Sequence, residues 1–165
     1  MSTARYSDLE AWGEIDSAAT KSLPSRRWVR SDNTESIAVI PITSDAARVM
    51  TAVRKVSKLM ALPDNWDGAG AQRPNAVACA FAIEAIRALD EAGLEATDID
   101  PSVENGICLS FLRGDKYAHI ECFNDGEVVG VISTLHGDAQ IWEVDGSSVR
   151  GWKAATKQLS QFLNR

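Results

Sequence analysis

A pair of alternating segments that meet at Gly114-Asp115 constrains the fold most strongly. Residues Ile107–Leu112 and Lys116–Phe123 place apolar side chains at every second position, as half-buried strands do. A tight turn at Gly114-Asp115 would pair the two segments in a single register. That register predicts the pairs Phe111 with Ala118, Leu109 with Ile120, and Ile107 with Cys122. These six side chains would share the buried face of an antiparallel hairpin.

Further strand signals extend the hairpin into a meander. Asp125-Gly126 is a typical hairpin turn and leads into a predicted strand at Glu127–Ser133. A second turn, His136-Gly137-Asp138, leads into a predicted strand at Ala139–Val144. The sequence therefore predicts an antiparallel sheet of about four strands.

Three helices are predicted around this sheet. The first covers about Ser44–Leu62, and the second covers about Asn75–Ala92 with Gly93 as its C-terminal cap. The last begins at Ser147 or Ser148. The apolar stripe of the first helix consists of Ala46, Val49, Val53, Val56 and Met60. That of the last consists of Val149, Trp152, Ala155, Leu159 and Phe162. Two central helices, a meander and a C-terminal helix indicate an α+β fold with the helices on one face.

A chain of 165 residues is expected to form one domain. We place that domain at residues 36–165, beginning with a short strand at Ser36–Ile40 that stops at Pro41. Residues 1–35 are expected to be a loosely structured N-terminal segment or to hold a short helix. No apolar run is long enough to cross a bilayer, and the first residues lack a secretory signal. Three cysteines without Cys-x-x-Cys spacing favour a reducing cytoplasm.

The loop between the first two predicted helices is one candidate ligand site. It carries Trp66, Asp67, Gly68 and Gly70 ahead of a helix N-terminus, where backbone amides can bind an anion. No Gly-Lys-Ser/Thr follows the glycines, so the loop is not a phosphate-binding P-loop. In the alternative interpretation Trp66 fills the gap between two helices and Asp67 bonds the turn backbone, while the glycines supply positive φ angles.

A second candidate site is the alternating triplet Tyr117, His119 and Glu121, which projects from one side of a strand. A histidine beside a carboxylate can do acid–base chemistry. The alternative is an ordinary polar outer face, because no nucleophile signature lies near either histidine. The histidines and cysteines lack metal-ligand spacing, so we predict no metal and no cofactor.

Charge favours a protein partner over nucleic acid. The net charge is −6, and residues 61–165 carry eight Lys/Arg against sixteen Asp/Glu. Six acidic residues follow one another without an intervening base: Asp90, Glu91, Glu95, Asp98, Asp100 and Glu104. Such a stretch repels nucleic acid and attracts a basic partner, although it also suits a solvated loop. Three arginines, Arg26, Arg27 and Arg30, leave a nucleic-acid regulator open as an alternative; a segment docking on its own acidic half explains them equally well.

The stretch Leu62-Pro63-x-Asn65-Trp66-Asp67-Gly68-x-Gly70-Ala71 resembles a group of uncharacterised small bacterial proteins with an Asn-Trp-Asp-Gly-Tyr-Gly-Ala motif. The likeness continues through Asn105-Gly106-Ile107 and Asp125-Gly126, covering about residues 60–133. Ala69 stands where that motif usually has Tyr. The resemblance implies the same α+β architecture and assigns no activity.

These observations predict a non-enzymatic cytoplasmic protein that binds a protein partner, of the immunity, antitoxin or phage-encoded inhibitor type. A homodimer is compatible with the sequence. The main alternative is a small-ligand-binding protein or enzyme that uses the Trp66 loop or the Tyr117/His119/Glu121 face.

Overall fold

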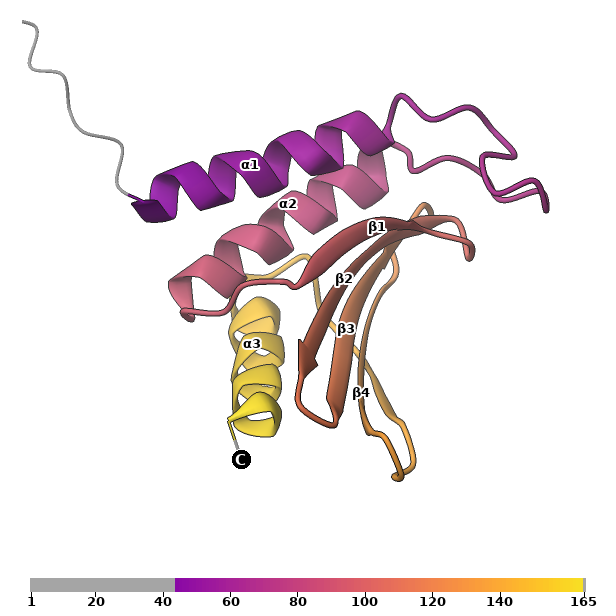
Figure 1. Ribbon diagram of the computed structural model, residues 1–165. Coiled ribbons are helices and arrows are strands. Elements are labelled where there is room, and N and C mark those ends of the chain that lie inside the picture. The colour runs from indigo at the N-terminus through magenta and orange to yellow at the C-terminus, as the bar shows by residue number, and fades with distance from the viewer. Residues whose placement is uncertain (1–43, 165) are drawn as a thin grey trace, which may run out of the picture. The chain divides into compact units, whose positions relative to one another are not determined.

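A computed structural model describes residues 44–164 and has the predicted α+β class (Figure 1). Its helices are α1 (Ser44–Leu59), α2 (Ala76–Glu91) and α3 (Val149–Leu163). Its strands are β1 (Asp98–Ser102), β2 (Gly106–Arg113), β3 (Lys116–Phe123), β4 (Val128–Thr134) and β5 (Gln140–Glu143). The N-terminal segment, the predicted strand at residues 36–40 and the three N-terminal arginines lie outside the described residues.

The five strands form one antiparallel meander in the order β1-β2-β3-β4-β5. β2 and β3 pair as predicted, with Phe111 opposite Ala118 and Leu109 opposite Ile120. The prediction of about four strands was close; the additional strand in the described sheet is β1, which pairs with β2. The sequence of β1 resembles that of a polar loop, because Ile99 is its only aliphatic residue. In the structure Ile99 is buried.

Helix caps fix the ends of α2 and α3 where the sequence places them. The Asn75 side chain accepts hydrogen bonds from the amides of Val77 and Ala78, and Ser148 accepts one from Gly151. Gly93 has a φ of 68°, the left-handed conformation of a helix C-cap. The cap at Gly93 ends α2 next to the segment that leads into β1.

The predicted apolar stripes of α1 and α3 are only partly buried. Val56 is fully buried in α1, whereas Ala46 is exposed and Met60 lies exposed beyond the end of the helix. Val149 of α3 is 71% exposed because it lies in the first turn, ahead of the first buried residue, Trp152. The ends of these stripes therefore remain on the surface.

The helices pack on one face of the sheet. α2 contacts β2 and β3, α3 contacts α2 and β4, and α1 contacts α2 and the edge strand β1 (Figure 1). The core between them includes Leu89, Ile107, Leu109, Ile120 and Leu159, all nearly or fully buried. Along residues 44–164, none of the helices has the length and apolar character that crossing a bilayer requires.

Candidate functional site

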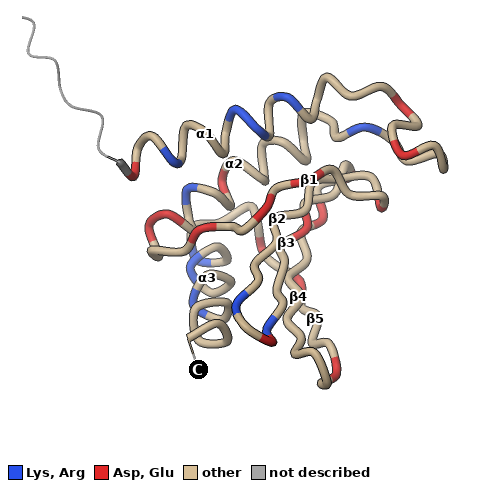
Figure 2. The backbone as a smooth tube through the Cα atoms, viewed as in Figure 1, with Lys and Arg blue, Asp and Glu red and all other residues tan. Residues whose placement is uncertain are grey.

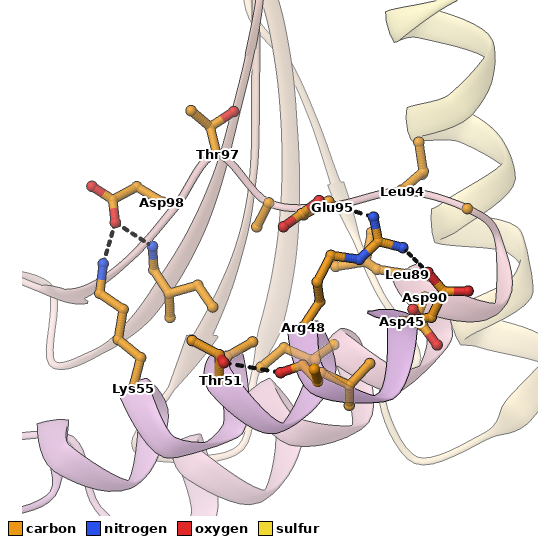
Figure 3. Close-up of a pocket in the computed structure, with 17 residues that line it drawn as sticks. Asp45, Arg48, Thr51, Lys55, Leu89, Asp90, Leu94, Glu95, Thr97 and Asp98 are labelled. Atoms are coloured by element: carbon orange, nitrogen blue, oxygen red, sulfur yellow. Dashed lines mark hydrogen bonds and ion pairs between the residues drawn. The ribbon is translucent and has the colours of Figure 1, made fainter. Parts of the chain in front are cut away.

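A groove of about 590 Å³ lies between α1 and the chain from Leu89 to Ile99 (Figure 3). We call it the α1 groove. Apolar side chains supply much of its lining: Val49, Ala52, Ile86, Leu89, Leu94, Ala96 and Ile99. Its volume falls within the range of clefts that hold small ligands or protruding side chains. The α1 groove is therefore large enough to receive part of a partner.

Lys55 of α1 reaches across one end of the groove to the edge strand. Its ammonium group hydrogen-bonds and ion-pairs with Asp98, and its Nζ lies 3.7 Å from Oδ1 of Asp100. The bond to Asp98 raises the pKa of Lys55, and the same bond lowers the pKa of Asp98. All three side chains are about half exposed, so solvent screens these pairs and each adds little stability.

Arg48, nearer the start of α1, makes similar ion pairs at the other end of the groove. Its guanidinium bonds Asp45 of the same helix, and its Nη1 lies 3.7 Å from Oε2 of Glu95 (Figure 3). Arg48 and Lys55 are seven residues apart, so they project from the same side of α1. Figure 2 shows Lys and Arg residues along α1, and Asp and Glu residues on the chain between α2 and β1.

The structure divides the predicted acidic surface. Asp90, Glu95 and Asp98 line the α1 groove. Asp100 lies next to it on β1, Glu91 borders a separate hollow between α2 and α3, and Glu104 is exposed in the turn after β1. The two bases of α1 were missed as part of the site; their spacing of seven residues was the available signal.

The Trp66 loop uses its own polar groups to hold its shape. Oδ1 of Asp67 accepts hydrogen bonds from the amides of Ala69, Gly70 and Ala71 at 2.9, 3.1 and 3.0 Å. These bonds lower the pKa of Asp67, the one from Ala69 most strongly. Gly68 and Gly70 have φ angles of 74° and 105°. Because the Asp67 carboxylate already occupies these amides, the geometry favours the structural interpretation over anion binding.

Two asparagines join the segment after this loop to the turns of the sheet. Oδ1 of Asn105 accepts a hydrogen bond from the Gln72 amide at 2.7 Å. Asn124 accepts one from the Asn75 amide at 2.8 Å and donates one to the Arg73 carbonyl at 3.0 Å. Trp66 lies in the same connection between α1 and α2 and is half-buried. Its buried Nε1 has no hydrogen-bond partner among the described residues.

Tyr117, His119 and Glu121 share the outer face of β3, as their alternation implies. The Tyr117 and His119 ring centroids are 5.5 Å apart, and Nε2 of His119 lies 3.9 Å from Oε2 of Glu121. That distance is too long for a hydrogen bond. Glu121 instead accepts a hydrogen bond from the Ser102 hydroxyl. Burial lowers the pKa of His119, and Glu121 offsets this only in part. No hydrogen bond therefore joins the histidine to the carboxylate of the triplet, and Nδ1 of His119 has no hydrogen-bond partner among the described residues.

Within residues 44–164, no three His, Cys, Asp or Glu side chains are arranged to hold a metal ion. Comparison with known proteins gives no match to this chain among family models, curated proteins or solved structures. The likeness to proteins with the Asn-Trp-Asp-Gly-Tyr-Gly-Ala motif stays a prediction.

Proposed function

We propose that this chain is a non-enzymatic cytoplasmic protein that binds a protein partner, and that the α1 groove receives a segment of that partner. The observation that carries this proposal is the combination of an apolar floor with a charged, exposed rim. Interfaces combine these features, with an apolar centre that excludes water and a polar border that sets specificity. An immunity protein, an antitoxin or an inhibitor would act in this way.

The groove's charges define the partner's chemistry. Four carboxylates line it, from Asp45, Asp90, Glu95 and Asp98, against the two bases Arg48 and Lys55. The lining therefore has an excess of two negative charges. A complementary segment carries an aliphatic side chain for the floor, with Lys or Arg on either side for the rim.

The composition of the lining favours binding over catalysis. Among the described residues, the groove is lined by no histidine, cysteine, serine or tyrosine, and threonine supplies the only hydroxyls. Three of its four carboxylates, those of Asp45, Glu95 and Asp98, pair with bases of α1. A general base beside an activated nucleophile, the usual arrangement in covalent catalysis, is thus missing from this lining.

A bulky residue in the groove tests the proposal. Thr51 is exposed on α1 and lines the groove, so Thr51→Trp should fill it while leaving the core intact. Ser57→Trp is a matched control, because Ser57 is also exposed on α1, also bonds the carbonyl four residues earlier, and lies outside the groove. Each tagged variant is used to capture proteins from a lysate of the organism that encodes the chain.

We expect wild type and Ser57→Trp to retain the same protein and Thr51→Trp to lose it. Retention of that protein by Thr51→Trp at the wild-type level would contradict a role for the groove. Thermal unfolding of each variant shows whether a loss of capture reflects a loss of fold.

A further inference from the structure

We infer that the α1 groove accepts helix α3 of a second copy of this chain, so that the protein forms a two-fold dimer. This inference rests on the proposed function, because it names a segment with the chemistry that the groove requires. It joins two surfaces of opposite charge that the same molecule carries.

Helix α3 presents a basic face that has no partner among residues 44–164. Arg150, Lys153 and Lys157 are exposed, and their spacing places them along one side of the helix. Val149–Leu163 contains no Asp or Glu. None of the three side chains makes an ion pair or hydrogen bond with a described residue, whereas Arg48 and Lys55 at the groove are both paired. Within residues 44–164, the bases of α3 are therefore available to external carboxylates.

The first turn of α3 also supplies the apolar group. Val149 is 71% exposed and adjoins Arg150, with Lys153 one turn further along the helix. An aliphatic side chain flanked by bases is the chemistry that the groove's apolar floor and acidic rim require. Val149 would enter the floor while Arg150 and Lys153 meet carboxylates such as Asp90 and Glu95.

A nucleic acid fits this basic face less well. Three bases are few against the phosphate contacts that such complexes make, and Glu84 and Glu91 border the hollow beside Val149 and Lys153. The chain as a whole has a net charge of −6, which repels a polyanion. A local acidic surface on a protein is the better match, and the α1 groove of another copy provides one.

The position of the two surfaces allows a closed dimer. Leu89 and Asp90, near the end of α2, line the groove. Arg87 and Glu91, on the same stretch of α2, line a hollow of about 230 Å³ that Val149 and Lys153 border. The groove and the start of α3 therefore flank the same part of α2. A two-fold axis close to this part of α2 would place each copy's α3 against the other's groove, giving two identical contacts.

Charge-reversed variants of the full chain test the dimer. One variant is Arg150→Glu with Lys153→Glu on α3, and the other is Asp90→Lys with Glu95→Lys in the groove. The control for the α3 variant is Arg54→Glu with Lys58→Glu, which reverses two exposed bases of α1 that lie outside the groove. Sedimentation velocity over a range of concentrations gives the dissociation constant of each protein.

Wild type and the Arg54/Lys58 control should dimerise, while each of the other variants alone should dissociate at least about 10-fold more readily. A mixture of the α3 variant with the groove variant should recover the association. Both contacts in the mixed dimer again join opposite charges. This recovery separates a specific contact from a general effect of net charge.

A wild-type chain that stays monomeric up to its limit of solubility would overturn the inference, as would a mixture that fails to associate. Either result leaves the proposed function standing if Thr51→Trp still loses its captured protein. Loss of dimerisation in Thr51→Trp, with dimerisation kept in Ser57→Trp, would place the contact in the groove.

Discussion

Trp66 and its neighbours show how a loop of distinctive sequence can serve the fold. The carboxylate of Asp67 binds three amides of its own loop, which leaves them without capacity for an external anion. The side chain of Trp66 is half-buried, and its Nε1 forms no hydrogen bond with the described residues. Its contribution therefore comes from packing of the ring and not from its polar group.

Two substitutions at Trp66 separate packing from hydrogen bonding. Trp66→Ala should lower the free energy of unfolding by about 2 kcal/mol, less than full burial of a tryptophan would give. Trp66→Phe should cost less than about 1 kcal/mol, because it keeps an aromatic ring in the site and the N–H donor that it removes is unsatisfied. Urea denaturation measures both values. Equal losses would show that the indole nitrogen has a partner.

His119 makes stability depend on pH. Burial lowers its pKa in the folded chain below the ordinary value of 6.5, so the fold favours the neutral ring. This contribution is complete above pH 6.5 and is lost as the pH falls from 6.5 through the lower pKa of the folded state. Wild type should lose stability over this interval relative to His119→Gln, as measured by denaturation at a series of pH values. Parallel pH profiles for the two proteins would exclude this role of His119.

At the scale of elements, the sequence predicted the features that depend on interactions between residues close together in the chain. The register of β2 on β3 follows from alternation and a short turn, and the ends of α2 and α3 follow from Asn75 and Ser148. β1 was missed because Asp98, Asp100 and Pro101 resemble a loop. Its strand form depends on pairing with β2 and on Lys55, which is distant in the sequence. The groove could not be predicted for the same reason: its two walls are separated along the chain.

Asn124 joins the turn between β3 and β4 to the start of α2. Asn124→Ala removes its bonds to the Asn75 amide and the Arg73 carbonyl, so the free energy of unfolding should fall by about 1 to 3 kcal/mol. Gln161→Ala is the control, because Gln161 is exposed on α3 and makes no hydrogen bond through its side chain to a described residue. Chemical denaturation checks both. A loss at Asn124 no larger than that at Gln161 would mean that water replaces these bonds.

At the scale of the molecule, the acidic and basic residues form more separate groups than the sequence suggests. The acidic stretch is not one surface, since its carboxylates divide between the groove, the edge strand, a second hollow and a turn. Bases of α1 partly neutralise the groove, whereas those of α3 form no ion pair within the described part of the chain. Exposed ion pairs of this kind are weak, so a partner's bases can replace them at little cost. The groove therefore combines an apolar floor with carboxylates that can exchange the bases of α1 for those of a partner.

The most direct measurement is the affinity of the captured partner for charge-reversed chains, by calorimetry at low and high salt. Asp90→Lys with Glu95→Lys reverses two carboxylates of the groove, and Glu127→Lys with Glu143→Lys makes the same charge change at exposed positions elsewhere. The groove variant should bind at least about 10-fold more weakly than wild type and should lose most of its salt dependence. The Glu127/Glu143 variant should bind within about 3-fold of wild type. Equal affinities and equal salt dependence for all three proteins would contradict binding at the α1 groove.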